Sequence, residues 1–189
     1  MKNSLTILLI AFTLLTFGNA HKWLKKIDAY NTSSYYKYQI YKQENLVSFL
    51  KLKEINRTIQ IDSFDFMLMN ACIFYCTNQL RNQHKMPLYL YDKRLQEAAM
   101  IHSWQMAKYH FFEHNNPYTS SLSSVEKRLN EMDVKYAMSG ENCHLNLISE
   151  DEFTYLELAQ KLLESLYRST LHRKNLLSKT FKFCANGIA

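Results

Sequence analysis

Residues 93–110 carry the pattern that most restricts how this chain can fold, an apolar stripe that recurs every three or four residues. Asp92 stands at the N-cap position, and the stripe predicts an amphipathic helix that leads directly into Phe111-Phe112-Glu113-His114. Because a histidine inside an apolar stripe is more often a hydrogen-bonded core residue than a ligand, we interpret His102 as a core residue. The stripe consists of Leu95, Ala98, Ala99, His102, Met106 and His110.

A second long helix is expected before this one. The pair Asp62-Ser63 can cap a helix that starts near Phe64 and whose apolar residues follow helical spacing. The helix should end before Pro87, because proline disfavours the helical conformation of the residue ahead of it. A short helix is also expected within residues 45–52.

Later elements follow from capping boxes and from alternation. Ser123 with Glu126 predicts a short helix, and Ser149 with Glu152 predicts a longer amphipathic one. The segments 142–148 and 181–189 have the pattern of strands, and the stretch 115–124 is predicted to be a loop.

The first 20 residues have the composition of a signal peptide. A basic start at Met1-Lys2 precedes an apolar run from Leu5 to Phe17, and Gly18-Asn19-Ala20 supplies the small residues that signal peptidase requires. We therefore expect cleavage after Ala20 and a secreted or periplasmic protein. The alternative is an uncleaved anchor, for which the run is short. No later stretch is long and apolar enough to span a bilayer, so no transmembrane span is expected after cleavage.

Positive charge is concentrated in one part of the chain. The net charge is +6, and residues 21–61 form a basic lead segment rich in tyrosine and lysine, whereas lysine and arginine balance the acids in residues 62–189. Such a segment is more often a solvated surface or a contact to an anionic envelope than a base-reading element. No pattern of a nucleic-acid module is present, so we expect no nucleic acid among the partners.

Four cysteines in an exported chain permit two disulfides and three connectivities, between which the sequence does not choose. Cys72 and Cys76 are four residues apart on a predicted helix, a spacing that seldom suits a bond between them, so we expect their partners elsewhere. The alternative for this pair is two buried apolar thiols. The other two cysteines are Cys143 and Cys184.

Three polar side chains stand in separate parts of the chain. His114 follows the helix over 93–110, Glu141 follows a glycine, and His172 lies in the segment 169–177. Two neutral imidazoles that met in the fold could bind Zn²⁺, and the carboxylate could add a third ligand or orient one histidine. The alternative is a hydrogen-bonded polar cluster that fixes loops and binds nothing.

Several short motifs in a fixed order resemble the bacterial type of the CAP superfamily, the SCP-like extracellular domain of cysteine-rich secretory proteins, insect venom antigens and plant pathogenesis-related proteins. Each motif alone is weak, but the series from about Ile73 to the end is specific. In chain order the matching runs are Thr77-Asn78-Gln79-Leu80-Arg81, Pro87-Leu88, His102-Ser103, Phe111-Phe112-Glu113-His114, Ser124-Val125-Glu126-Lys127-Arg128-Leu129, Gly140-Glu141-Asn142, Leu171-His172-Arg173-Lys174-Asn175-Leu176 and Gly187-Ile188-Ala189.

The resemblance implies an α+β fold, a three-layer α-β-α sandwich with a small antiparallel sheet, over residues 62–189. It also implies a cleft lined by two histidines and two acids, of which His114, Glu141 and His172 are the counterparts here. The place of the second acid falls near Ser169. The resemblance also implies a final strand that continues well past the position of Gly187, whereas this chain stops at Ala189. The two alternatives are a domain that lacks the last strand of its sheet and a sequence that is incomplete.

Three functions are compatible with these residues. We favour an extracytoplasmic binding module whose cleft takes a metal ion at His114 and His172, or a small ligand. One alternative is a metal-assisted hydrolase with Glu141 or a histidine as general base, or with Cys143 as a thiol nucleophile. The other, implied by the resemblance, is a lipid-binding or sterol-binding protein. The expected partners are thus a small ligand, a lipid or an extracellular protein, and the sequence leaves the oligomeric state open.

Overall fold

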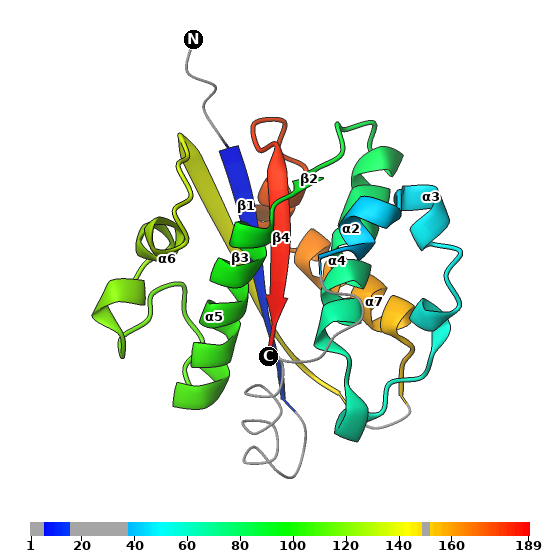
Figure 1. The fold of residues 1–189 in the computed structure, drawn as a ribbon, viewed down its shortest axis with the longest axis horizontal. Helices are drawn as coiled ribbons and strands as arrows, with labels where there is room; N and C mark the ends of the chain where they lie inside the picture. The colour runs from blue at the N-terminus through cyan, green and yellow to red at the C-terminus, as the bar shows by residue number, and fades with distance from the viewer. Residues whose placement is uncertain (1–5, 16–37, 149–151) are drawn as a thin grey trace.

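The computed structural model describes residues 6–15, 38–148 and 152–189 (Figure 1). Four strands form one sheet in the order β2-β4-β1-β3, with β3 at one edge. The chain ends at β4, which lies inside the sheet. The strands are β1 (Thr6–Leu15), β2 (Leu90–Tyr91), β3 (Met138–Leu147) and β4 (Phe183–Ile188).

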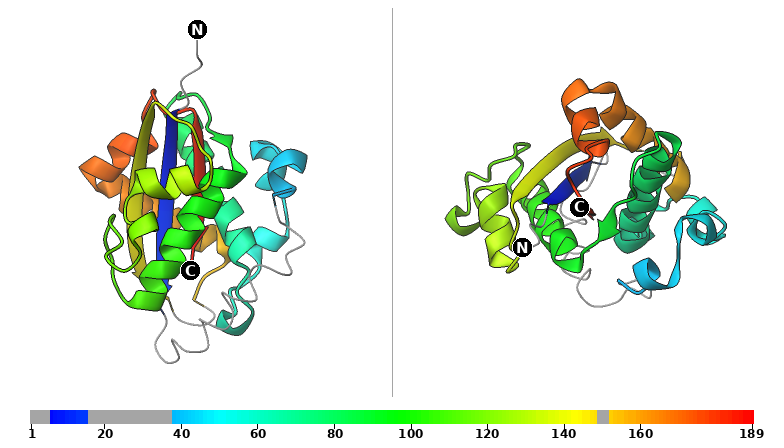
Figure 2. Two further views of the ribbon diagram at one scale, coloured as in Figure 1. Left: turned by 60° about the vertical axis from the view of Figure 1, so that its left-hand side comes forward. Right: turned by 90° about the horizontal axis from the view of Figure 1, so that it is seen from above.

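Helices cover both faces of this sheet, so the predicted α+β class and the three layers are confirmed. One face packs against α4 (Phe66–Gln83), α7 (Tyr155–Arg168) and α8 (Thr170–Leu176). The other face is covered by α5 (Lys93–Tyr109) and α6 (Val125–Glu131), as the view from above in Figure 2 shows. The main core lies between α4, α7 and the sheet, because both helices turn an apolar face inward there.

The direction of the strands differs from the expectation. Every strand pair in the described residues is parallel: β1 with β3, β1 with β4, and β2 with β4. The prediction of an antiparallel sheet was therefore wrong. The physical reason is visible between β3 and β4, since α7 and α8 in the connection carry the chain back so that both strands run the same way.

The starts of the helices were predicted to within a few residues, but the capping residue was predicted correctly only for α5 among the four longer predicted helices. Asp92 caps α5 as expected, by accepting a hydrogen bond from the amide of Arg94. The cap of α4 is Asp65 instead of Asp62-Ser63, and the cap of α6 is Ser124 instead of Ser123. For α7 the capping box is Thr154 with Glu157, whereas the predicted box begins at Ser149, which lies outside the described residues.

The segment before α4 packs on the domain where it is described. Two short helices, α2 (Ile40–Gln43) and α3 (Leu46–Phe49), lie against α4. Ile40, Phe49 and Ile55 are buried in the main core. Residues 38–61 therefore contribute apolar surface to the same core as the helices that follow.

The predicted signal peptide overlaps the sheet. Residues 1–5 and 16–20 lie outside the described residues, while residues 6–15 form β1 between β3 and β4. Removal of residues 1–20 stays a prediction, as does the absence of a last strand. Within the described ranges, no helix combines the length and the apolar character needed to cross a membrane.

The four cysteines are free and buried, so the expected disulfides are not present. Cys72 and Cys76 lie in the main core on α4, where burial raises the pKa of the Cys76 thiol to about 12. The interpretation of this pair as buried apolar thiols is the one that the structure supports. Cys143 and Cys184 are on β3 and β4, the two strands that flank β1.

The end of α5 is strained at His110, which allows a stability prediction. His110 adopts the left-handed conformation with φ 56°, and the amides of His110 and Phe111 both bond to the carbonyl of Met106. Glycine occupies this C-cap position without steric cost. We expect His110→Gly to raise the free energy of unfolding by about 0.5–1 kcal/mol, measured by urea denaturation. Equal or lower stability would contradict this account.

Candidate functional site

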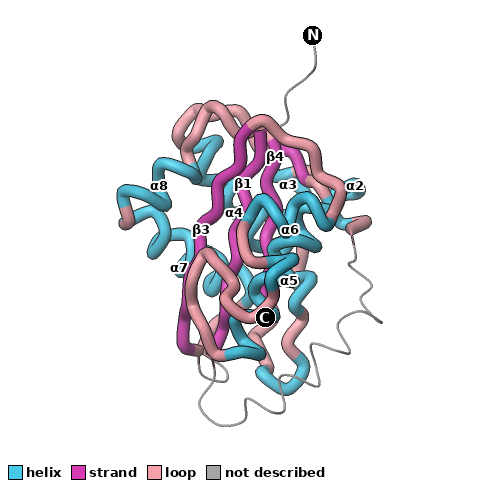
Figure 3. Tube along the Cα trace, turned by 90° about the vertical axis from the view of Figure 1, so that its left-hand side faces the viewer, coloured by secondary structure: helices cyan, strands magenta, loops and turns pink. Residues whose placement is uncertain are grey.

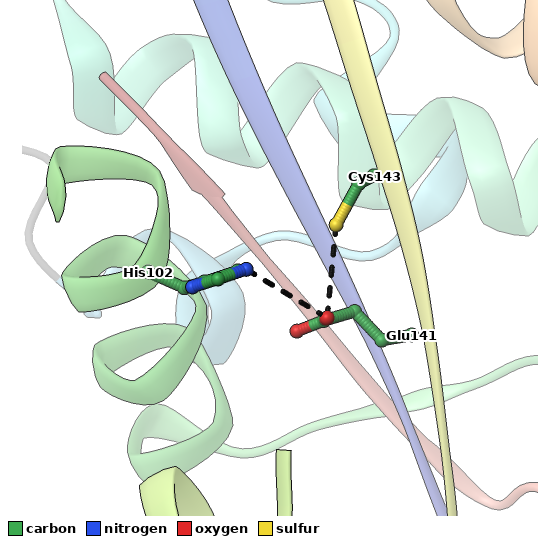
Figure 4. A group of neighbouring side chains, drawn as sticks. All are labelled: His102, Glu141 and Cys143. Atoms are coloured by element: carbon green, nitrogen blue, oxygen red, sulfur yellow. Dashed lines mark hydrogen bonds and ion pairs between the residues drawn. The ribbon is translucent and has the colours of Figure 1, made fainter. Parts of the chain in front are cut away.

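Glu141 is the centre of the polar cluster that the sequence predicted. Its side chain is almost fully buried and points from the edge strand β3 toward His102 on α5 (Figure 4). The Oε2 atom accepts a hydrogen bond from Nη2 of Arg128 at 2.8 Å, and Oε1 lies 3.0 Å from Nδ1 of His114. Burial alone raises the pKa of this carboxyl, but the hydrogen bond from His114 and the charge of Arg128 outweigh it, so the pKa lies below its ordinary value.

Arg128 fixes this carboxylate in place. The guanidinium is fully buried, and besides Glu141 it donates to the carbonyl oxygens of Leu122 and His114. One side chain on α6 therefore ties together β3 and the loop that carries His114. The sequence analysis missed Arg128 as a site residue, although it lies inside one of the motifs that carried the family resemblance.

His114 is the exposed member of the cluster, with 56% of its side chain accessible. A carboxylate only accepts hydrogen bonds, so Nδ1 of His114 must carry the proton that it donates to Glu141. The neutral ring then presents an unprotonated Nε2. This hydrogen bond raises the pKa of His114 above its ordinary value. A buried carboxylate that fixes the tautomer of an exposed imidazole is a typical arrangement behind a metal ligand or a general base.

His102 lies beneath this pair as a core residue, as predicted. It is fully buried, and Nε2 bonds to the carbonyl oxygen of Glu113 at 2.9 Å. Burial is the main reason that its pKa falls to about 4, so the ring is neutral at pH 7. Nε2 of His102 lies 3.9 Å from Oε1 of Glu141. Because the ring is neutral, the two side chains do not form an ion pair at that pH.

Three ligand-type atoms, of His102, Glu141 and Cys143, lie within 4.8 Å of one another (Figure 4). The hydrogen bonds that these side chains already make argue against a metal ion between the three atoms. Nε2 of His102 must be protonated to bond a carbonyl oxygen, and the two carboxylate oxygens of Glu141 already hold Arg128 and His114. Burial also raises the pKa of the Cys143 thiol, which keeps it protonated and disfavours a nucleophilic role.

His172 belongs to α8, a helix that lies beside the edge strand β3 (Figure 3). Its carbonyl oxygen accepts a hydrogen bond from Asn142 at 3.1 Å, and Asn175 donates to Asn142 at 2.8 Å. Burial, and then the charge of His114, lower the pKa of the His172 ring. The two histidines thus influence one another electrostatically, while the amides of Asn142 and Asn175 tie α8 to β3.

Ser169 lies at the junction of α7 and α8, where it is the N-cap residue of α8 without a side-chain capping bond. Glu164, the acid nearest in sequence, is exposed on α7 and pairs with Arg168 at 2.6 Å. In the candidate site one buried acid, Glu141, pairs with His114, while His172 is joined to β3 through its main-chain carbonyl.

Comparison with known proteins gives the family. The sequence profile of the cysteine-rich secretory protein family, CAP, matches residues 74–189. This range contains all the site residues above. This chain belongs to the CAP family. A comparison with curated proteins found no match. Membership of the CAP family confirms the resemblance stated from the motifs.

One solved structure is similar to this CAP domain, the crystal structure of an extracellular protein from Bacillus anthracis that contains an SCP domain. The two share 27% sequence identity with a TM-score of 0.51. The similarity covers 64% of this chain and 37% of the other chain, so this chain matches little more than a third of that protein's length. The likeness supports the fold of the CAP domain described above.

The neutral, buried His102 predicts how the stability of this CAP domain depends on pH. In the unfolded chain a histidine takes up a proton below pH 6.5, whereas in the fold His102 does so only near pH 4. The folded state therefore loses stability as the pH falls from 6.5 to 4, by about 2 kcal/mol between pH 7 and pH 5. Urea denaturation at both pH values measures this loss.

The variant His102→Gln isolates this effect, because glutamine does not titrate. The raised pKa of His114 acts in the opposite direction, since its contribution is complete below pH 6.5 and is lost as the pH rises through the raised value. We expect His102→Gln to lose about 2 kcal/mol less than the parent between pH 7 and pH 5. An identical loss in both proteins would show that His102 is not the titrating group.

Proposed function

We propose that this CAP domain is an extracytoplasmic binding module whose site centres on the exposed Nε2 of His114. The observation that carries the proposal is the pairing of an accessible imidazole with a carboxylate that is 2% exposed. Burial of Glu141 against Arg128 holds the ring of His114 in one orientation before any ligand arrives. A ligand then meets a preorganised donor or acceptor, which favours binding.

A divalent metal such as Zn²⁺ fits the donor chemistry of this site. His114 supplies a free Nε2, Glu141 supports it through Nδ1, and His172 on α8 is the candidate for a second imidazole ligand. Since two protein ligands hold the ion only weakly, water or a small polar ligand would complete the coordination. The domain would then act as a carrier or receptor that recognises a ligand through the bound ion.

The extracytoplasmic location is proposed on two grounds. The SCP-domain protein of Bacillus anthracis is described as extracellular. The apolar residues at the N-terminus of this chain also have the composition of an export signal.

Calorimetric titration of the metal-free protein with Zn²⁺ tests the proposal. We expect one site per chain, and an affinity at least about tenfold weaker in His114→Ala and in His172→Ala. His84→Ala is the matched control, because His84 is an exposed histidine at the far end of α4 and should leave the affinity unchanged. Heats that are the same in all four proteins would contradict a metal site at these histidines.

A metal-assisted hydrolase is the second candidate, favoured by the same hydrogen bond between His114 and Glu141. An imidazole oriented by a carboxylate is suited to take a proton from water. Turnover of peptide or ester libraries that requires Zn²⁺ and disappears in His114→Ala would favour this function over simple binding.

Lipid binding has less support from the residues. A groove of about 240 Å³ lies between α4 and α7, and half of the side chains that line it carry amide or carboxylate groups. A binding site for an acyl chain or a sterol is expected to be mostly apolar. The lining residues are Cys76, Gln79, Leu80, Gln83, Gln160, Leu163, Glu164 and Tyr167.

A further inference from the structure

Residues 54–58 carry a chemical signal that lies outside the site of His114. Their sequence is Glu54-Ile55-Asn56-Arg57-Thr58. An asparagine followed two residues later by threonine, with no proline between them, is the acceptor motif for N-linked glycans in exported proteins. Bacterial oligosaccharyltransferases also require an acidic side chain two residues before the asparagine, and Glu54 supplies it. The segment therefore meets the sequence requirement of both the bacterial and the eukaryotic enzymes.

The fold holds this motif on the surface between two buried anchors. Ile55 and Ile59 belong to the main core, with exposures of 0% and 1%. The core contacts of these isoleucines fix the position of the segment, while its polar side chains stay in solvent. A glycan requires such a place, because it is bulky and hydrated. The exposed residues are Glu54, Asn56, Arg57 and Thr58.

Backbone contacts hold the motif against the start of α7. The amide of Ile59 donates to the carbonyl of Phe153 at 2.8 Å, and Thr58 forms an isolated antiparallel bridge with Thr154. The short helix η1 (Glu54–Asn56) also contacts α7. The motif therefore belongs to the folded domain, on the side of the sheet that carries α4 and α7, across from α5 and α6 (Figure 1).

The side-chain amide of Asn56 can carry a glycan and keep its contact in the fold. Its nitrogen donates one weak hydrogen bond, of 3.5 Å, to the carbonyl of Leu52. This nitrogen has two hydrogens, so the exchange of one for a sugar leaves the other for Leu52. In the transfer the nitrogen bonds to the anomeric carbon of a lipid-linked oligosaccharide and loses one proton. The bond from that carbon to the lipid diphosphate breaks, and the diphosphate leaves with the electron pair.

We propose that Asn56 is an N-glycosylation site of this CAP domain, and that Glu54 and Thr58 are the residues that the transferring enzyme recognises. In the cell the modification requires export, which the proposed function also assumes, but it does not depend on the metal site. The glycan would project from the side of the sheet opposite α5, so the site at His114 would stay open to its ligand.

Incubation of the purified full chain with a bacterial oligosaccharyltransferase and its lipid-linked oligosaccharide tests the proposal. We expect the intact mass to rise by one glycan, which peptide mapping locates at Asn56. Both Asn56→Gln and Glu54→Gln should lose this product, because the first removes the acceptor and the second removes the required acid. No product in the parent chain, or an unchanged product in either variant, would overturn the proposal.

The chain offers a matched control in a second, shorter motif, Asn31-Thr32-Ser33. Ala29 stands where the bacterial enzyme requires an acid, so Asn31→Gln should keep the whole product. Loss of the product in this control would overturn the assignment to Asn56.

Urea denaturation of the glycosylated chain checks that the fold has room for the glycan. Its midpoint should equal that of the unmodified chain, because Asn56 is exposed. A lower midpoint would overturn the account of an open acceptor site. Mass and midpoint are both measured without Zn²⁺, so a failure of the metal site at His114 would leave this result unaffected.

Discussion

Replacement of Gly187 by alanine is expected to lower the free energy of unfolding by at least about 3 kcal/mol or to prevent folding. A Cβ atom at this position would overlap the backbone of Ala99 and Met100 on α5. A backbone cannot rotate away as a side chain can, so α5 or β4 would have to shift as a whole. That shift would also break the hydrogen bond from Ser103 to the carbonyl of Gly187. Urea denaturation followed by circular dichroism measures the loss.

Gly140→Ala is the matched control, because it adds the same methyl group elsewhere in the sheet. There the new Cβ would meet the ring of Phe181, with the nearest atom at 2.8 Å. An aromatic ring at the side of a strand can turn to relieve such a contact, so we expect a smaller loss, of about 1–2 kcal/mol. The account of Gly187 would be wrong if its alanine variant were as stable as Gly140→Ala.

Arg128→Met is expected to cost about 3–5 kcal/mol of stability, because it leaves the carboxylate of Glu141 buried without a cation. Arg128 is fully buried and also satisfies the carbonyls of Leu122 and His114, which would lose their donors. Methionine keeps much of the side-chain volume, so the loss reports on charge and hydrogen bonds more than on packing. The same substitution should release the ring of His114 from its fixed orientation.

A double-mutant cycle separates the pair from the rest of the site. Glu141→Gln removes the buried charge, so Arg128→Met combined with Glu141→Gln should cost less than the sum of the single changes. Lys127→Met is the control on the same helix, where the lysine is exposed, and should cost less than about 0.5 kcal/mol. If Arg128→Met were no more harmful than Lys127→Met, the buried pair would not be a main support of the site.

Local patterns predicted the helices well and the strands less well. The stripe over residues 93–110 became α5, and Asp92 caps it as expected, because capping and periodicity depend on neighbours a few residues away. The displaced caps of α4 and α6 follow from the presence of several competing Asp or Ser residues at each helix start. The predicted direction of the strands was wrong, because strand direction depends on the path of the connections and not on the alternation of residues within a strand.

The candidate site was predicted through motifs. The contact of His114 with Glu141 agrees with the counterparts that the family resemblance suggested. Arg128 was not foreseen, because a buried arginine has the same local sequence pattern as an exposed one. The position of His172 depends on the docking of α8 against β3 through Asn142 and Asn175, a long-range contact that no local pattern predicts.

The sequence by itself determined the family, the amphipathic helices, and His114 and Glu141 as a candidate pair, because these depend on the spacing and chemistry of neighbouring residues. Only the tertiary structure decided that the sheet is parallel, that the cysteines are free, and that Arg128 and Glu141 meet beneath the exposed His114. It also placed residues 6–15 between β3 and β4. These features arise from contacts between segments far apart in the chain, whose cost or benefit exists only once the segments are packed together.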